Sequence, residues 1–244
     1  MTAASPDIVR EFASSGRLRA ALNMGNPVLA RSRTSTEKPA GVTIDLARAF
    51  AALLGVDVEF LQFDTPGKSG GALAAGEADI GFLAVDPKRA EGIHFTAPYI
   101  QIDGCYLVRD ASPLRSAHEV DRAGTRVVVG DGSAYELFLS RHLQHATLVK
   151  VKTSEGVVDT FVQDAELDVA AGVRQQLESD VRRVSGVRLL PEAFMTIQQA
   201  MAMQRGRSAQ AQQFLESFIL EQRRSGFILQ ALQRHGIEGA TVIP

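Results

Sequence analysis

Strand-length apolar runs alternate with helical patterns along most of this chain, and this alternation constrains the fold more than any other feature. The first series runs from RLRAALN at 17–23, through the helical pattern at 42–55, to ADIGFLA at 78–84. A second series begins with TRVVVG at 125–130 and ends with the helical pattern at 173–184. Strands that alternate with helices predict mostly parallel sheets covered on both faces. Two such series predict an α/β fold with two lobes.

Two long extended segments, at residues 99–109 and 196–205, contain no helical pattern. If both segments cross between the lobes, the helices after the second one return to the first lobe, and the second lobe is an insertion. The predicted lobes are residues 1–102 with 203–244, and the inserted residues 103–202. A two-strand hinge of this kind allows the lobes to close around a ligand. A cleft between α/β lobes is a natural site for a small molecule, because open α/β sheets bind ligands beyond the carboxyl ends of their strands.

Composition argues against several classes of partner. The chain has 244 residues and a net charge of -2, and it contains no run of lysine and arginine, so nucleic-acid binding is not expected. No apolar stretch reaches the length of about 18 residues that is typical of a membrane span. The single cysteine, Cys105, cannot form an internal disulfide and is expected to be an inert buried thiol. Because no metal-ligand spacing, phosphate loop or Ser-His-Asp pattern stands out, we expect no metal and no cofactor.

The first residues predict a helix and not a secretory signal. Ser5 can cap a helix, Pro6 suits its first position, and Asp7 suits its positive end. The segment lacks the basic, apolar and cleavage regions of a signal peptide. The sequence therefore leaves open a cytoplasmic protein or a mature form whose leader was removed.

The charge of Arg89 is the most informative feature of the first series. It follows an apolar run and a turn containing Pro87, and a second apolar burst comes directly after it. A guanidinium never loses its charge and offers five donors in a fixed fork, so it must reach water, a carboxylate or a phosphate. Arg89 therefore either faces solvent or meets an anion.

Five motifs together carry a resemblance that covers nearly the whole chain. They are GVTIDLARAFAALLGVDVEF, ALAAGEADIGF, DPKRAEGIHFTAPY, VVVGDGSAYE and LDVAAGVRQQLE. In this order they resemble the type II periplasmic solute-binding proteins, family 3, which serve ABC transporters for polar amino acids. The resemblance implies two α/β lobes joined by two strands, one small carboxylate-bearing ligand, a periplasmic location and a membrane permease as partner.

The resemblance also implies a set of ligand-binding residues. Arg89 would clamp the ligand carboxylate by a bidentate charge-assisted pair. The turn that contains Ser133 would meet the other side of the ligand through backbone N–H groups and the hydroxyl, although a plain helix cap explains Ser133 equally well. The predicted ligand-binding residues are Asn23, Asn26, Phe63, Asp64, Ala84, Arg89, Gly132, Ser133, Ala134, Tyr135, Val173 and Arg174.

Some of these positions depart from the family pattern. Ala84 stands where a hydroxyl residue would help the arginine hold a carboxylate. Asn23, Asn26 and Pro66 stand where the family often places aromatic rings. Phe63 and Tyr135 could partly replace those rings, and simple packing is the alternative for both.

The departure at Val173 bears on the class of ligand. Val173 stands where the family has the acid that receives the ligand ammonium, and Arg174 would add a second positive charge if it faces the cleft. A buried ammonium without a partner would cost several kcal/mol. We therefore predict that common α-amino acids bind weakly, and that the ligand is an organic acid or an amino-acid derivative whose amine is held differently, for example by Asp64.

An enzyme on the same fold is the main alternative. Cyclohexadienyl dehydratases resemble this family and need only a positioned acid in the cleft. Glu136 and Glu178 are the nearest acids, and both are expected to be exposed helix residues. The effector domain of a transcription regulator is a weaker alternative, because no helix-turn-helix pattern precedes the first sheet. A receptor without chemistry of its own remains the main prediction.

Overall fold

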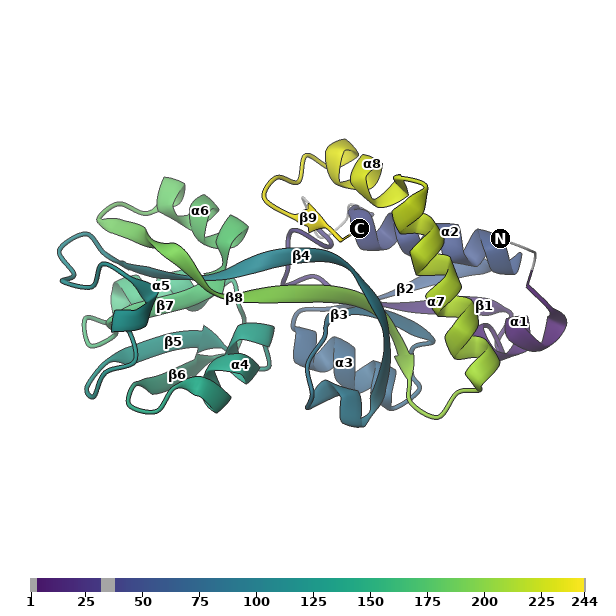
Figure 1. Ribbon diagram of the computed structural model, residues 1–244, viewed down its shortest axis with the longest axis horizontal. Helices are drawn as coiled ribbons and strands as arrows, with labels where there is room; N and C mark the ends of the chain where they lie inside the picture. The colour runs from purple at the N-terminus through teal and green to yellow at the C-terminus, as the bar shows by residue number, and fades with distance from the viewer. Residues whose placement is uncertain (1–3, 32–37, 244) are drawn as a thin grey trace. The chain divides into compact units, whose positions relative to one another are not determined.

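The computed structural model describes residues 4–31 and 38–243, and it divides into two compact units. Unit 1 comprises Met1–Gln101 with Gln198–Pro244, and unit 2 comprises Ile102–Ile197. Two long strands, β4 and β8, pass from one unit into the other (Figure 1). The structure is of the α/β class, as the alternation of patterns predicted.

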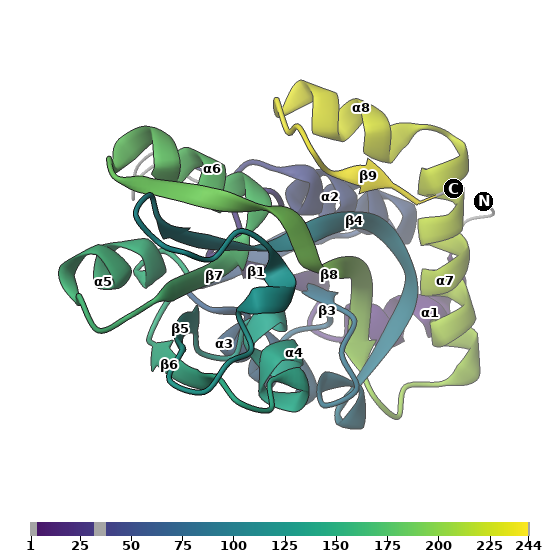
Figure 2. The ribbon, with the colours of Figure 1, turned by 60° about the vertical axis from the view of Figure 1, so that its left-hand side comes forward.

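Unit 1 is built on a sheet with the strand order β2-β1-β3-β8, in which β1 pairs in parallel with both β2 and β3. The final part of β8 joins β3 in the antiparallel sense, with Ala84 opposite Gln199. The short strand β9 pairs with β4 (Figure 2). The elements are α1 (Pro6–Phe12), β1 (Arg17–Asn23), α2 (Val42–Leu54), β2 (Asp57–Phe63), α3 (Pro66–Ala74), β3 (Ile80–Ala84), the 3-10 helix η1 (Arg89–Glu91), the first part of β4 (Ile93–Arg109), the last part of β8 (Val187–Gln204), α7 (Ala209–Arg224), α8 (Phe227–Arg234) and β9 (Thr241–Val242).

Helices cover both faces of the unit 1 sheet. On one side Phe12 of α1, Phe50 of α2 and Phe218 of α7 pack together, with ring centroids 5.0 Å apart for each contact with Phe50. On the other side α3 places Leu73 against Leu83 of β3 in a buried apolar cluster. The parallel strands are therefore covered on both faces, which is what their near-continuous apolar runs require.

Unit 2 repeats the arrangement with a sheet in the order β4-β7-β5-β6. Strands β5, β6 and β7 are parallel to one another, and β4 is antiparallel to β7. Phe161 of α5 and Leu177 of α6 pack with Val128 of β5 in one apolar core. The elements are η2 (Ala117–Glu119), β5 (Arg126–Gly130), α4 (Ala134–His142), β6 (Thr147–Val151), α5 (Val157–Gln163), β7 (Val169–Val173) and α6 (Arg174–Arg183), with the remainder of β4 and β8.

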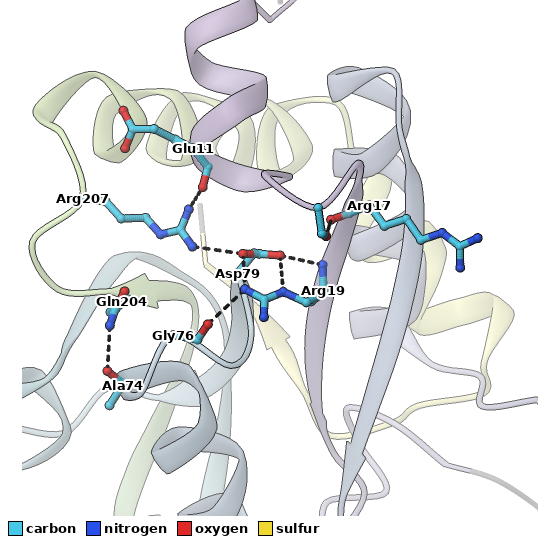
Figure 3. Close-up of polar contacts among 9 residues, drawn as sticks. Glu11, Arg17, Arg19, Ala74, Gly76, Asp79, Gln204 and Arg207 are labelled. Atoms are coloured by element: carbon cyan, nitrogen blue, oxygen red, sulfur yellow. Dashed lines mark hydrogen bonds and ion pairs between the residues drawn. The ribbon is translucent and has the colours of Figure 1, made fainter.

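A buried ion-pair network holds the amino ends of β1 and β3 (Figure 3). Asp79 is only 2% exposed. Its carboxylate accepts hydrogen bonds from the Arg19 side chain at 2.9 and 3.0 Å and from Arg207 at 3.2 Å. Arg207 also donates to the backbone oxygen of Glu11, and its guanidinium lies 5.4 Å from the centre of the Phe12 ring. The network therefore ties α1 and the start of α7 to the sheet.

Asp121 fixes a loop of unit 2 by accepting from consecutive backbone N–H groups. Its carboxylate accepts from Gln144, His145 and Ala146 at 2.8 to 3.1 Å. The bond from Ala146, followed by those from Gln144 and His145, lowers the pKa of Asp121. A carboxyl group with a lowered folded-state pKa stabilises the folded state above its unfolded pKa of about 3.9, and that stabilisation is lost as the pH falls through the folded value.

We expect Asp121→Ala to release these three amides. Hydrogen exchange at pH 7 should become faster at Gln144, His145 and Ala146, because their hydrogen-bond acceptor is gone. Asp110→Ala, which removes an exposed carboxylate elsewhere in unit 2, is the control and should leave these amides unchanged. Unchanged exchange in the Asp121 variant would contradict the assignment.

Candidate functional site

Arg89 lies just beyond the carboxyl end of β3, in the 3-10 turn η1. Arg89 is half-buried, and its Nη1 donates a 3.0 Å hydrogen bond to the carbonyl oxygen of Ala84, the last residue of β3. The turn that carries it is shaped by Asp86, whose Oδ1 accepts from the N–H of Lys88 at 2.9 Å. The guanidinium is therefore directed back to the edge of the sheet at which open α/β folds bind ligands.

Asn23 and Asn26 shape the loop that follows β1. Asn23 is buried, and its Oδ1 accepts from the N–H of Gly25 at 3.1 Å, while the Oδ1 of buried Asn26 accepts from Val28 at 3.1 Å. A Cβ atom at Gly25 would lie 2.8 Å from the backbone oxygen of Asp64, so only glycine allows this approach of the two loops. The loops after β1 and β2 therefore form one close-packed segment of the sheet edge.

Phe63 and Asp64 come from the end of β2. Phe63 pairs with Asn23 in the strand register, and its ring is partly buried against the apolar cluster that contains Leu73 of α3. Asp64 is exposed and forms an ion pair with Lys68 at 2.7 Å, both side chains being about half exposed. Asp64 is therefore partly neutralised within its own unit.

In unit 2 the predicted turn opens α4. Gly132 has a φ of 68°, and the Oγ of Ser133 caps the helix by accepting from the N–H of Glu136 at 3.0 Å. Ala134 is the first residue of α4. Ser133 therefore caps α4, which is one of the two roles that the sequence left open for it. Its side chain is buried.

Tyr135 is buried and does not offer an exposed ring. Burial raises the pKa of its hydroxyl, while hydrogen bonds with Ser154, Ser133 and the backbone of Gly130 act in the opposite direction. A Cβ atom at Gly130 would lie 2.7 Å from the Oγ of Ser154, so the loop after β6 passes directly over the end of β5. Tyr135 therefore joins the loops after β5 and β6, and Ser154 is a residue that sequence reasoning missed.

The prediction that Glu136 is an exposed helix residue is wrong. Its side chain is 4% exposed and forms an ion pair with Lys150 of β6, in which Nζ lies 2.8 Å from Oε1. The carboxylate also accepts a hydrogen bond from the Ser140 hydroxyl at 3.2 Å. The Glu136 carboxylate raises the pKa of Lys150. Both partners already engage this acid, and the pair with Lys150 ties α4 to β6. Glu178 is exposed, as expected.

Val173 and Arg174 stand at the junction of β7 and α6. Val173 lies opposite Gly104 in the β4–β7 register, and Arg174 is the first residue of the helix. The Nε of Arg174 lies 3.2 Å from Oδ2 of Asp103, the residue before Gly104. Arg174 is therefore ion-paired and not a purely solvent-facing residue, and Asp103 is an acid at this edge that sequence reasoning did not identify.

Cys105 is buried beside this pair and forms no disulfide. Burial raises the pKa of its thiol to about 11; Arg174 opposes the shift, and Asp103 and Glu178 add to it. A thiol with such a pKa is unreactive at neutral pH. The prediction of a buried cysteine is confirmed, and its inertness stays a prediction that the raised pKa supports.

In residues 4–31 and 38–243, no three His, Cys, Asp or Glu side chains are grouped so as to hold a metal ion. No helix among these described residues has the length and apolar character needed to cross a membrane.

Two α/β units that share two long strands define a type II periplasmic-binding-protein fold. Residues 18–236 match the profile of the bacterial extracellular solute-binding proteins, family 3, and the chain belongs to that family. Its role is therefore that of a solute-binding protein, and the sequence resemblance is confirmed. Among curated protein sequences, none matches the chain.

Several solved structures share the fold. The Streptococcus pneumoniae amino acid transporter protein AbpA, bound to L-arginine, is 20% identical with a TM-score of 0.77, and the match covers 92% of this chain and 96% of that one. A transporter binding component from Wolinella succinogenes, complexed with lysine, is 19% identical with a TM-score of 0.75, over 90% and 95% of the two chains. The ancestral amino acid-binding protein AncCDT-1, a precursor of cyclohexadienyl dehydratase, is 19% identical with a TM-score of 0.76, over 93% and 98%. Identities this low establish the fold and not the ligand.

Proposed function

We propose that this protein is the solute receptor of an ABC-type uptake system in the periplasm, and that it takes a small carboxylate-bearing ligand, an organic acid or an amino-acid derivative. A membrane permease would be its partner. The family supports the receptor role, and Arg89 supports the class of ligand. Its half-buried guanidinium, at the carboxyl end of β3, is the single observation that carries the proposal.

The proposed ligand set keeps Arg89 as the anchor and assigns indirect roles to several other residues. Asn23, Asn26 and Tyr135 would shape the loops around the ligand, because their polar groups are engaged within those loops. Phe63, Ala84, Gly132, Ser133, Ala134 and Val173 would supply packing or backbone contacts.

Catalysis is the less supported alternative. The positioned acid that an enzyme needs would have to be free to exchange a proton with its substrate. Glu136 is buried in a pair with Lys150, and Glu178 is exposed to solvent, which reduces the support for either. Incubation with prephenate or arogenate should therefore leave both compounds unchanged, and the appearance of product would establish the enzyme.

The proposal predicts a selective response in a thermal-shift screen of the twenty amino acids beside mono- and dicarboxylates. A ligand at about 100 times its dissociation constant stabilises the folded state by about 2.7 kcal/mol, which is readily seen as a higher Tm. We expect organic acids to raise the Tm and unmodified α-amino acids to raise it little. Mass spectrometry of small molecules released from the purified protein is the independent measurement. Micromolar binding of an unmodified amino acid would contradict the ligand class.

A further inference from the structure

We infer that unit 2 carries an anion-binding arginine, Arg174, held in place by Asp103, and that the ligand of this receptor therefore has a second anionic group. The inference rests on the proposed function, since it concerns the ligand of the same receptor. It concerns a contact made by unit 2 alone.

The geometry of the pair leaves one edge of the guanidinium available. Asp103 bonds to the Nε of Arg174 at 3.2 Å, and among the described residues this is the only hydrogen bond of the Arg174 side chain. An arginine has five N–H donors, and the two terminal nitrogens carry four of them in a planar fork that fits a carboxylate. A carboxylate bound at Nε fixes the plane of the fork without covering its outer edge.

Exposure and surroundings favour a ligand over bulk water. The Arg174 side chain is 26% exposed and that of Asp103 is 40% exposed, so the guanidinium is partly desolvated while it remains accessible. The adjoining residues are Val173 and Gly104, which offer no charge, and buried Cys105, which stays a neutral thiol. Glu178 is close enough to act on the pKa of Cys105, and its exposure allows water to screen its charge. A partly desolvated cation is stabilised more by a partner anion than a fully hydrated cation is.

Asp103 acts in this scheme as a positioning residue. Without its carboxylate, the long Arg174 side chain would lose a fixed geometry and would pay rotamer entropy each time it bound an anion. Asp103 comes from β4 and Arg174 from the start of α6, and the antiparallel β4–β7 register brings them together. A ligand ammonium would meet the positively charged outer edge of the guanidinium and would be disfavoured there.

Matched ligands test the inference by calorimetry on the intact protein. Succinate, glutarate and adipate carry the second carboxylate; butyrate, pentanoate and hexanoate lack it; and 4-aminobutyrate, 5-aminopentanoate and 6-aminohexanoate replace it with an ammonium. We expect at least one dicarboxylate to bind about tenfold or more tightly than both of its counterparts. Arg174→Gln should remove that advantage of the dicarboxylate over its monocarboxylate counterpart.

Two further variants separate positioning from general effects. Arg182→Gln removes the same charge from an exposed position on the same helix, and it should leave every affinity unchanged. Asp103→Asn should reduce the dicarboxylate advantage by about threefold to tenfold, because Arg174 keeps its charge and loses its orientation. A change in folding alone would lower the affinity for mono- and dicarboxylates alike.

The outcomes distinguish the two proposals. The inference of a second anionic group would be wrong if monocarboxylates bound as tightly as dicarboxylates. It would also be wrong if the Arg174→Gln variant kept the full preference for dicarboxylates. Either result would leave the proposed receptor for carboxylates uncontradicted. Tighter binding of the ω-amino acids, lost in Asp103→Asn, would identify Asp103 as an ammonium acceptor and would also overturn the inference. Binding of none of these dicarboxylates would overturn the inference, whereas the receptor for carboxylates is tested separately by the thermal-shift screen.

Discussion

Asp79→Asn is expected to lower the free energy of unfolding by about 3 to 5 kcal/mol, because removing one partner of a buried ion pair leaves uncompensated charge behind. Asp79 accepts from two arginines and from the backbone N–H of Arg19 at 2.9 Å. Its carboxylate raises the pKa of Arg19, chiefly through their hydrogen bonds. The side chain of Arg207 is only 13% exposed, so water cannot fully replace the lost acid.

Unit 2 offers a matched control for this prediction. Asp168 stands before β7 as Asp79 stands before β3, and it accepts from the backbone N–H of Arg126 at 2.8 Å. Asp168 is exposed and forms no ion pair with an arginine in the described chain, so Asp168→Asn should cost about 1 kcal/mol. Denaturant unfolding of the two variants measures the difference. Equal losses would mean that the strand-start hydrogen bond, and not the ion-pair network, carries the stability.

Local patterns were sufficient to predict the elements with strong periodicity. The helix start at Ser5 and Pro6 is confirmed, since the Ser5 Oγ accepts from the N–H of Ile8 at 3.4 Å. The second extended segment was predicted only from residue 196, whereas β8 begins at Val187. Residues 191–193 and 196 are exposed, so this part of the strand lacks the apolar alternation that marks a half-buried strand.

Contacts between distant segments account for what sequence missed at the site. Asp103 and Arg174 are adjacent because β4 and β7 pair in a particular antiparallel register, and the buried carboxylate of Glu136 has its ion-pair partner, Lys150, on another element, β6. Neither register nor partner is encoded in the local pattern. Arg89 could be singled out as a candidate because a charged residue between two apolar segments is unusual in itself.

Arg89→Ala is expected to abolish binding of the carboxylate that gives the largest shift in the thermal screen. Loss of a desolvated bidentate pair costs about 2 to 5 kcal/mol, which corresponds to about 30-fold to several-thousand-fold in affinity. Arg89→Lys should recover only part of the loss, because an ammonium keeps the charge and lacks the planar fork. Both affinities can be measured by isothermal titration calorimetry.

The position of Arg89 in its turn allows the structural and binding roles to be separated. Its side chain donates to the Ala84 carbonyl oxygen at 3.0 Å from a half-buried position, and loss of this hydrogen bond should lower the free energy of unfolding by about 1 kcal/mol. Lys88→Ala removes a positive charge from the neighbouring exposed residue and should change affinity little, since a screened surface charge contributes little to binding. A folded Arg89→Ala protein with undiminished affinity would show that the anchor lies elsewhere. Equal losses of affinity in the Arg89 and Lys88 variants would indicate a general effect of positive charge and not a bidentate pair with Arg89.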